Sequence, residues 1–194
     1  NLSEMKSRQS LIISLFLMVL VSALYRIMPS RPMGFAPQIA MGLFSGALFV
    51  RQKQWAFALP LVSMFLSDLL YQWLYIEGLT PIAGFYGGQW VNYLLFAGTV
   101  CFGFLIRSSK ISRIILAAVS APTAYFLVSN FLVWQASGLG YGLNRPHTFL
   151  GLLQCYNDAL PFYLNSLSAT SVFSAVLFGS YYLTVHRRTA QVKL

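Results

Sequence analysis

The sequence has few charged residues and almost no acids. Only 9% of its 194 residues are charged, and four acidic residues stand against thirteen lysines and arginines. Soluble domains average about a quarter charged residues. With 57% hydrophobic residues and a mean hydropathy of +0.65, the composition predicts an integral membrane protein.

Cysteine and histidine are also scarce, with two of each. No nucleophile and base pair, phosphate-binding glycine loop or metalloprotease spacing occurs, so we expect no enzyme. Cys155 and His147 are soft metal ligands in one predicted outer loop, but no third ligand accompanies them. Cys155 is therefore a weak metal-ligand candidate, and the sequence indicates no particular cofactor.

Six apolar stretches approach the roughly 20 residues that a membrane-spanning helix needs. They lie near residues 10–28, 37–51, 55–76, 89–107, 111–135 and 159–186. Nothing divides the chain into smaller units. The expected fold is all-α: a single transmembrane domain over residues 1–194, built as an integral membrane bundle of six transmembrane helices.

Basic residues set the expected orientation, because lysine and arginine concentrate in cytoplasmic loops. If the N-terminus is inside, every basic residue except Arg26, Arg31 and Arg145 falls on the cytoplasmic side. Both termini are then cytoplasmic, in a bacterial inner membrane. The net charge of +9 follows this topology, so we expect membrane lipid and no nucleic acid as a partner.

Polar side chains gather in the outer half of the predicted helices. Asp68 lies about 12 Å below the outer end of its helix, Asn92 and Asn130 lie nearer to that surface, and Asn157 and Asp158 cap the last helix. Such groups are costly in hydrocarbon and normally face a protein interior or a wet cavity. The pattern predicts an outward-facing pocket for a small molecule.

An ordinary structural role is the alternative, since amides and carboxylates also join membrane helices through hydrogen bonds. Asp68 requires a cationic partner, a bound cation or a proton. Arg26, Arg31, Arg145 and Asn130 are its possible partners. A structural ion pair between Asp68 and one of these arginines stays open.

Two further sets of residues suggest contacts. Tyr141 and Phe85 lie in glycine-rich outer loops and are candidates for a lid over a flat apolar ligand. Ala36 and Ala40, and likewise Gly42 and Gly46, have the spacing that lets helix backbones approach closely. That small-residue surface serves either internal packing or a partner subunit.

The chain resembles a family of uncharacterised bacterial membrane proteins described as candidate transport proteins. The similarity lies in the segments APQIAMGLFSGALF, ALPLVSMFLSDLLYQ, VSNFLVW, HTFLGLLQCYNDALPFYLNSL and SAVLFGSYYL. That family is in turn similar to the S components of energy-coupling-factor (ECF) vitamin transporters, which have six helices and bind a vitamin or a metal from outside.

The resemblance implies that outer loops gate a pocket and that a separate transmembrane subunit with two ATPases drives transport. S components often dock through alanines on their first helix, whereas Ala36 and Ala40 lie on the second. Corrinoid-binding relatives use a cysteine toward the metal, a role that only Cys155 is placed to fill.

Two functions remain open from the sequence. The first is membrane-embedded binding and uptake of a small molecule. The second is a non-catalytic accessory subunit of a larger membrane complex, in which the polar cluster only joins helices. A pocket of roughly 300 Å³ or more, lined by Asp68 and the amides, favours the first.

Overall fold

The computed structural model describes residues 15–106, 110–137 and 145–191, with side chains up to residue 183. These residues form six helices and no strand. The helices are Leu15–Arg26, α2 (Gln38–Leu48), α3 (Lys53–Ile76), α4 (Gln89–Phe104), α5 (Ile111–Gln135) and α6 (Phe149–Gln191). The all-α expectation is confirmed for the described residues.

Three helices are long and apolar enough to cross a membrane. They are α3 with 24 residues, α5 with 25 residues and the first 35 residues of α6, Phe149–Leu183. Leu15–Arg26 and α2 are shorter apolar helices. With 11 residues, α2 is only about 16 Å long, against a hydrocarbon core of about 30 Å. The chain is thus a membrane-associated protein, and by length three of the six expected spans are present.

The last helix begins earlier than the sequence predicts. We expected it to start near residue 159, but α6 starts at Phe149 and contains Pro161. Proline lacks an N–H group and clashes with the carbonyl four residues earlier, so it often ends a helix or precedes one. A polar run just before a proline is therefore easily taken for a loop. The helix nevertheless continues through it. Asn157 and Asp158 therefore lie within α6 and do not cap it.

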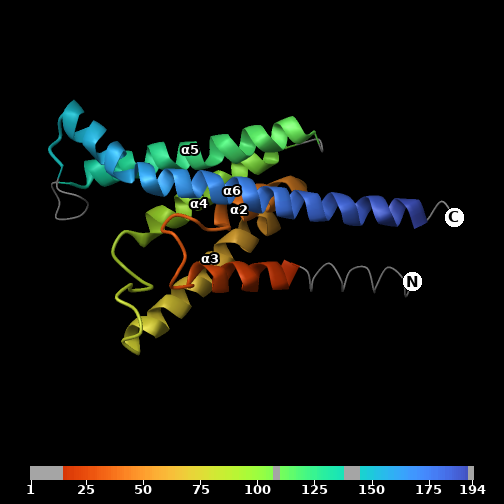
Figure 1. The fold of residues 1–194 in the computed structure, drawn as a ribbon, viewed down its shortest axis with the longest axis horizontal. Coiled ribbons are helices and arrows are strands. Elements are labelled where there is room, and N and C mark those ends of the chain that lie inside the picture. Colours follow the sequence, from red (N-terminus) through yellow and green to blue (C-terminus); the bar gives the residue numbers. More distant parts are fainter. Residues whose placement is uncertain (1–14, 107–109, 138–144, 192–194) are drawn as a thin grey trace.

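The helices alternate in direction along one axis (Figure 1). The connecting segments 27–37, 77–88 and 145–148 lie toward the left of the view, which we call the loop end. The start of Leu15–Arg26 and the far end of α6 lie at the opposite end. Arg51 and Lys110 are in the connections at that opposite end and Lys53 is the first residue of α3 there, so we call it the basic end.

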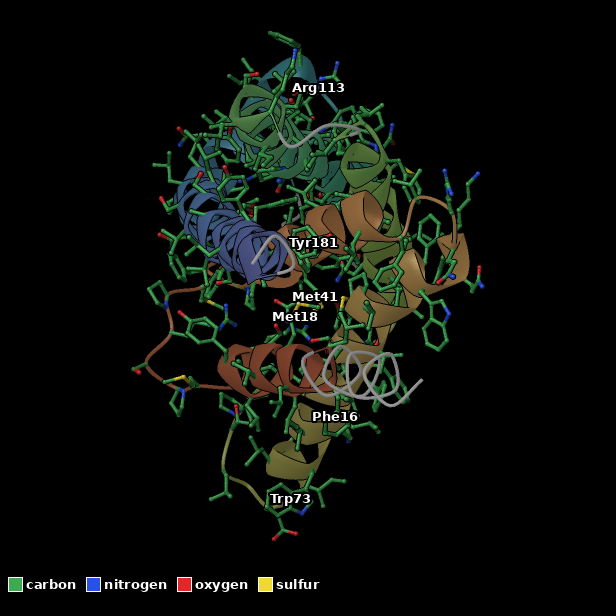
Figure 2. All side chains as sticks on the ribbon, turned by 90° about the vertical axis from the view of Figure 1, so that its right-hand side faces the viewer. Phe16, Met18, Met41, Trp73, Arg113 and Tyr181 are labelled. Carbon is green, nitrogen blue, oxygen red and sulfur yellow. The ribbon has the colours of Figure 1, made fainter. Side chains whose placement is uncertain are left out.

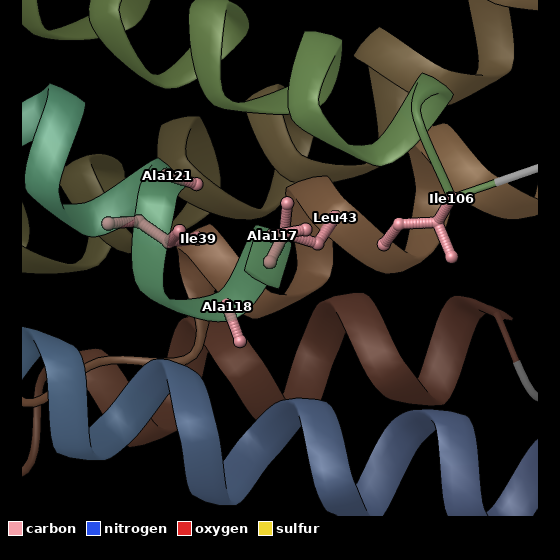
Figure 3. Packing of buried hydrophobic residues seen from close by; sticks show 6 residues of the cluster. All are labelled: Ile39, Leu43, Ile106, Ala117, Ala118 and Ala121. Carbon is pink, nitrogen blue, oxygen red and sulfur yellow. The ribbon is translucent and has the colours of Figure 1, made fainter. Parts of the chain in front are cut away.

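α2 is the central helix. All its residues from Gln38 to Gly46 are buried. Ile39 and Leu43 pack with Ile106 and with alanines of α5 in one apolar cluster (Figure 3). The outside is apolar as well: side chains such as Phe16 and Trp73 lie at the periphery (Figure 2) and are more than half exposed. Such a surface suits lipid.

Glycines bring α2 and α4 into backbone contact. A Cβ atom on Gly46 would lie 2.5 Å from the carbonyl oxygen of Val100 and 2.9 Å from the Cα of Gly103. A Cβ on Gly42 would lie 2.9 Å from the hydroxyl of Thr99. The small-residue surface therefore packs internally, with Ala40 also buried and Ala36 facing the cavity described below.

α2 also supports a break in α3. Pro60 lies inside α3 and has no N–H group to donate to the carbonyl of Ala56. The hydroxyl of Ser45 in α2 donates to that carbonyl at 2.7 Å. A side chain of the neighbouring helix thus supplies the hydrogen bond that proline removes.

Candidate binding cavity

A cavity of about 330 Å³ lies near the loop end, beneath the segments 27–37 and 77–88. The first helix and each of α2 to α6 contribute to its wall. Its charged and amide lining residues are Arg26, Arg31, Gln38, Asp68, Gln89, Asn92 and Asn130. A polar cavity thus lies within a set of apolar helices.

Asp68 accepts hydrogen bonds from three side chains, one of the first helix and two of α4. Arg26 donates to one carboxylate oxygen. Gln89 Nε2 and the hydroxyl of Tyr93 each donate to the other oxygen at 2.6 Å. The carboxylate is buried, with 1% of the residue exposed. The ion pair that the sequence left open is therefore made with Arg26.

Arg26 is itself held in place. Its guanidinium also donates to the hydroxyl of Ser67 and, at 3.3 Å, to the carbonyl of Met64. The hydroxyl of Tyr71 donates to the main-chain carbonyl of Arg26 at 2.7 Å. These contacts join the end of the first helix to α3 and leave the Arg26 charge compensated by Asp68.

Arg31 has no carboxylate partner among the residues that the structure describes. Its Nε donates to the carbonyl of Arg26 at 3.0 Å, and its Nη1 donates to the carbonyl of Phe35 at 2.9 Å. Across the part of the chain that the structure describes, the two ion pairs are Arg26 with Asp68 and Arg145 with Asp158. The cavity wall therefore carries two guanidinium groups and one carboxylate.

A second cluster of hydrogen-bonded side chains joins α4, α5 and the segment 77–88. Asn92 donates to the hydroxyl of Tyr86 and accepts a hydrogen bond from the hydroxyl of Tyr125 at 3.3 Å. Partial burial raises the pKa of Tyr86, which lies in the segment 77–88. The shift favours the neutral phenol, whose hydroxyl can donate a hydrogen bond.

Aromatic rings make up much of the remaining wall. Phe126 stacks on Tyr163 with ring centroids 4.6 Å apart, and Phe96 lies against Tyr125 at 4.9 Å. Asn130 lines the cavity but donates its amide to the carbonyl of Phe126 at 2.8 Å. The cavity thus combines an aromatic wall with charged and amide groups.

Four of the sequence-predicted residues lie elsewhere or cannot be placed. Asn157 is exposed on α6, and Asp158 pairs with Arg145 through an Nε to Oδ2 distance of 3.1 Å. Phe85 packs on Phe65 and does not line the cavity. Tyr141 lies outside the described residues.

Cys155 is buried and is not part of the cavity wall. Its Sγ lies 3.5 Å from the carbonyl oxygen of Asn130, to which the thiol donates. Within the described ranges no group of three or more His, Cys, Asp or Glu residues is arranged to hold a metal ion. The proposed soft-ligand role of Cys155 gains no neighbouring ligand from this arrangement.

The sequence reasoning missed two glutamines. Gln38 and Gln89 are the first residues of α2 and α4, and a polar residue at a helix start is usually an ordinary end residue. Gln89 contacts Asp68, as described above. Gln38 is 2% exposed, and its Oε1 atom is buried with no hydrogen-bond partner among the described residues.

Comparison with known proteins gives one match. Residues 6–192 match the model of a family described as "Family of unknown function (DUF6580)". The chain belongs to this family. No curated protein and no solved structure matches the chain. The description of DUF6580 assigns no activity.

Proposed function

We propose that this DUF6580 protein binds a small molecule from outside the cell in the cavity at its loop end and takes part in its uptake. The observation that supports this is the cavity of about 330 Å³ lined by Asp68, Asn92 and Asn130. Ligand sites usually have about 300–1,000 Å³ and a few polar groups in an apolar wall. The protein then acts by binding and does not catalyse a reaction.

The proposed setting is a bacterial cytoplasmic membrane, with six helices in the bilayer and both termini inside. Basic connections favour the cytoplasm, and the basic end lies opposite the cavity. α2 is too short to span the bilayer by itself. Because it is buried among the other helices, the non-helical backbone at its ends can lie within the membrane without contacting lipid.

Uptake against a gradient needs energy, and the sequence contains no phosphate-binding glycine loop of the kind that nucleotide hydrolysis uses. The resemblance to ECF S components favours an energising transmembrane subunit with ATPases as a partner. In the rival function, the protein is an accessory subunit of another membrane complex and docks through the small-residue surface. Gly42 and Gly46 pack against α4 of the same chain and are therefore not exposed for a partner, which favours the binding function.

Filling the cavity tests the proposal. Ser166 lines the cavity, whereas Ser171 on the same helix is exposed. We expect native mass spectrometry of gently extracted wild-type protein to show a bound small molecule. Ser166→Phe should lower its occupancy at least about tenfold, because a phenyl ring takes space that the molecule needs.

Ser171→Phe is the matched control and should retain the molecule. If wild-type protein carries only lipid, or only large partners in fixed stoichiometry, the accessory-subunit function is favoured. Equal occupancy in both variants would place the bound molecule outside this cavity.

Cysteine labelling tests the orientation. In a background with Cys101 and Cys155 replaced by alanine, we expect a membrane-impermeant maleimide to label Ile82→Cys in intact cells, because the segment 77–88 is at the loop end. Lys53→Cys at the basic end should be labelled only after the cells are opened. The reverse pattern would turn the cavity toward the cytoplasm and contradict uptake from outside.

A further inference from the structure

We infer that the bound molecule is a small water-soluble organic anion with an apolar body, whose negative group contacts Arg31. This inference rests on the proposed binding function and adds the substrate class. It comes from the charges and the aromatic groups of the cavity wall, and from the hydrogen bonds that hold Arg31 there.

The first support is the charge of the wall. Among the described residues that line the cavity, Arg26, Arg31 and Asp68 are the charged ones. Arg26 and Asp68 compensate each other through a direct contact. One positive charge therefore remains, and a charge partly removed from water favours an ion of opposite sign.

The second support is the bonding of Arg31. Its Nε and Nη1 atoms donate to main-chain carbonyls of the segment 27–37 and of Arg26, which fixes the guanidinium at the cavity wall. Guanidinium groups have five N–H donors and match carboxylate and phosphate oxygens well. Hydrogen bonds to neutral carbonyls leave the positive charge of Arg31 uncompensated, whereas a bound anion would compensate it.

The third support concerns the rest of the molecule. Phe96, Tyr125 and Phe126 line the same cavity and make part of its wall aromatic. An anion with an apolar body therefore matches the wall.

The test uses an aqueous metabolite extract of the host cell, labelled with ¹³C and separated on an anion-exchange resin into retained and unretained fractions. Water extraction leaves lipids out. Each fraction is incubated with immobilised full-length protein, and bound ¹³C molecules are identified by mass spectrometry. We expect a molecule from the retained, anionic fraction on the wild-type protein.

Arg31→Gln should lower the bound amount at least about tenfold, because a hydrogen bond to a charged group contributes that much to affinity. Arg31→Lys keeps the charge and should retain a preference for the retained fraction. Arg113→Gln is the matched control, since it removes an exposed charge outside the cavity and should change nothing.

Each other outcome has a definite meaning. Binding only from the unretained fraction overturns the anion inference and leaves the proposed function standing. An anion that binds Arg31→Gln, shown by its melting temperature to be folded, as well as wild type also overturns the inference. Binding from neither fraction overturns the proposed function, and the inference with it.

Discussion

Replacement of Asp68 by alanine is expected to destabilise the protein by about 3–5 kcal/mol, the usual cost of leaving a buried charge without its partner. Arg26 would keep its hydrogen bonds to Ser67 and Met64 but lose the carboxylate. Tyr93 would lose the acceptor of its hydroxyl, and Gln89 would keep only the carbonyl of Gly84. The measurement is the free energy of unfolding in detergent, by titration with a denaturing detergent.

Asp158→Ala is the matched control. It breaks the other ion pair, between Arg145 and Asp158, whose side chains are 37% and 35% exposed. Exposed pairs contribute only up to about 1 kcal/mol. The double variant Arg26→Met with Asp68→Leu should recover much of the loss, since apolar replacements of a buried pair are often tolerated. Equal losses for Asp68→Ala and Asp158→Ala would show that the Arg26 pair is not a buried anchor.

The second large effect is expected at the contact between α2 and α4. Gly46→Ala places a methyl group 2.5 Å from the main-chain oxygen of Val100. The clash is with main-chain atoms, so no flexible side chain can move aside to relieve it. Overpacking of this kind costs about 1–3 kcal/mol. The same unfolding titration should therefore show a loss near the upper end of that range.

Gly98→Ala gives a result of opposite sign. Gly98 lies in α4, and a Cβ there meets nothing within 4 Å. Alanine is favoured over glycine within a helix by about 1 kcal/mol. A gain in stability for Gly98→Ala together with a loss for Gly46→Ala supports the backbone contact. Gains for both would mean that α2 and α4 do not approach as closely as described.

The helices were the predictable part of the fold. α5 begins and ends where the sequence placed it, at residues 111 and 135, because apolar residues predominate on both sides of its Pro122. α6 was not predictable at its start, because its first turns are polar and Pro161 follows them. Periodicity gives no measure of whether a helix tolerates one missing hydrogen bond.

The level along the helices at which polar residues gather could be predicted, but not which face of each helix turns toward the cavity. Asp68, Asn92 and Asn130 line it, as their depth suggested, whereas Asn157 does not. α6 lines the cavity with Ala159, Phe162, Tyr163 and Ser166, a single helical face. Asn157 is two residues from Ala159 and thus about 200° around the helix. Only the packing of α6 fixes which face turns inward.

The two glutamines were hidden for a different reason. Gln38 and Gln89 begin their helices, and the same residue type at a helix start is common in any protein. What distinguishes Gln38 is burial to 2% exposure. That burial depends on the first helix, whose Ser22 carbonyl accepts its amide at 3.4 Å. Such a contact between separate helices leaves no trace in local sequence.

The hydrogen bond from Ser45 to α3 has a mechanical consequence. α2 is a stiff rod about 16 Å long, with Gln38 in the cavity wall at one end and Ser45 bonded to the proline break of α3 toward the other. Its glycine contact with α4 prevents it from bending aside. A tilt of the half of α3 nearer the basic end would therefore push or pull Gln38 directly, so that the cavity and the basic end of the bundle are mechanically connected.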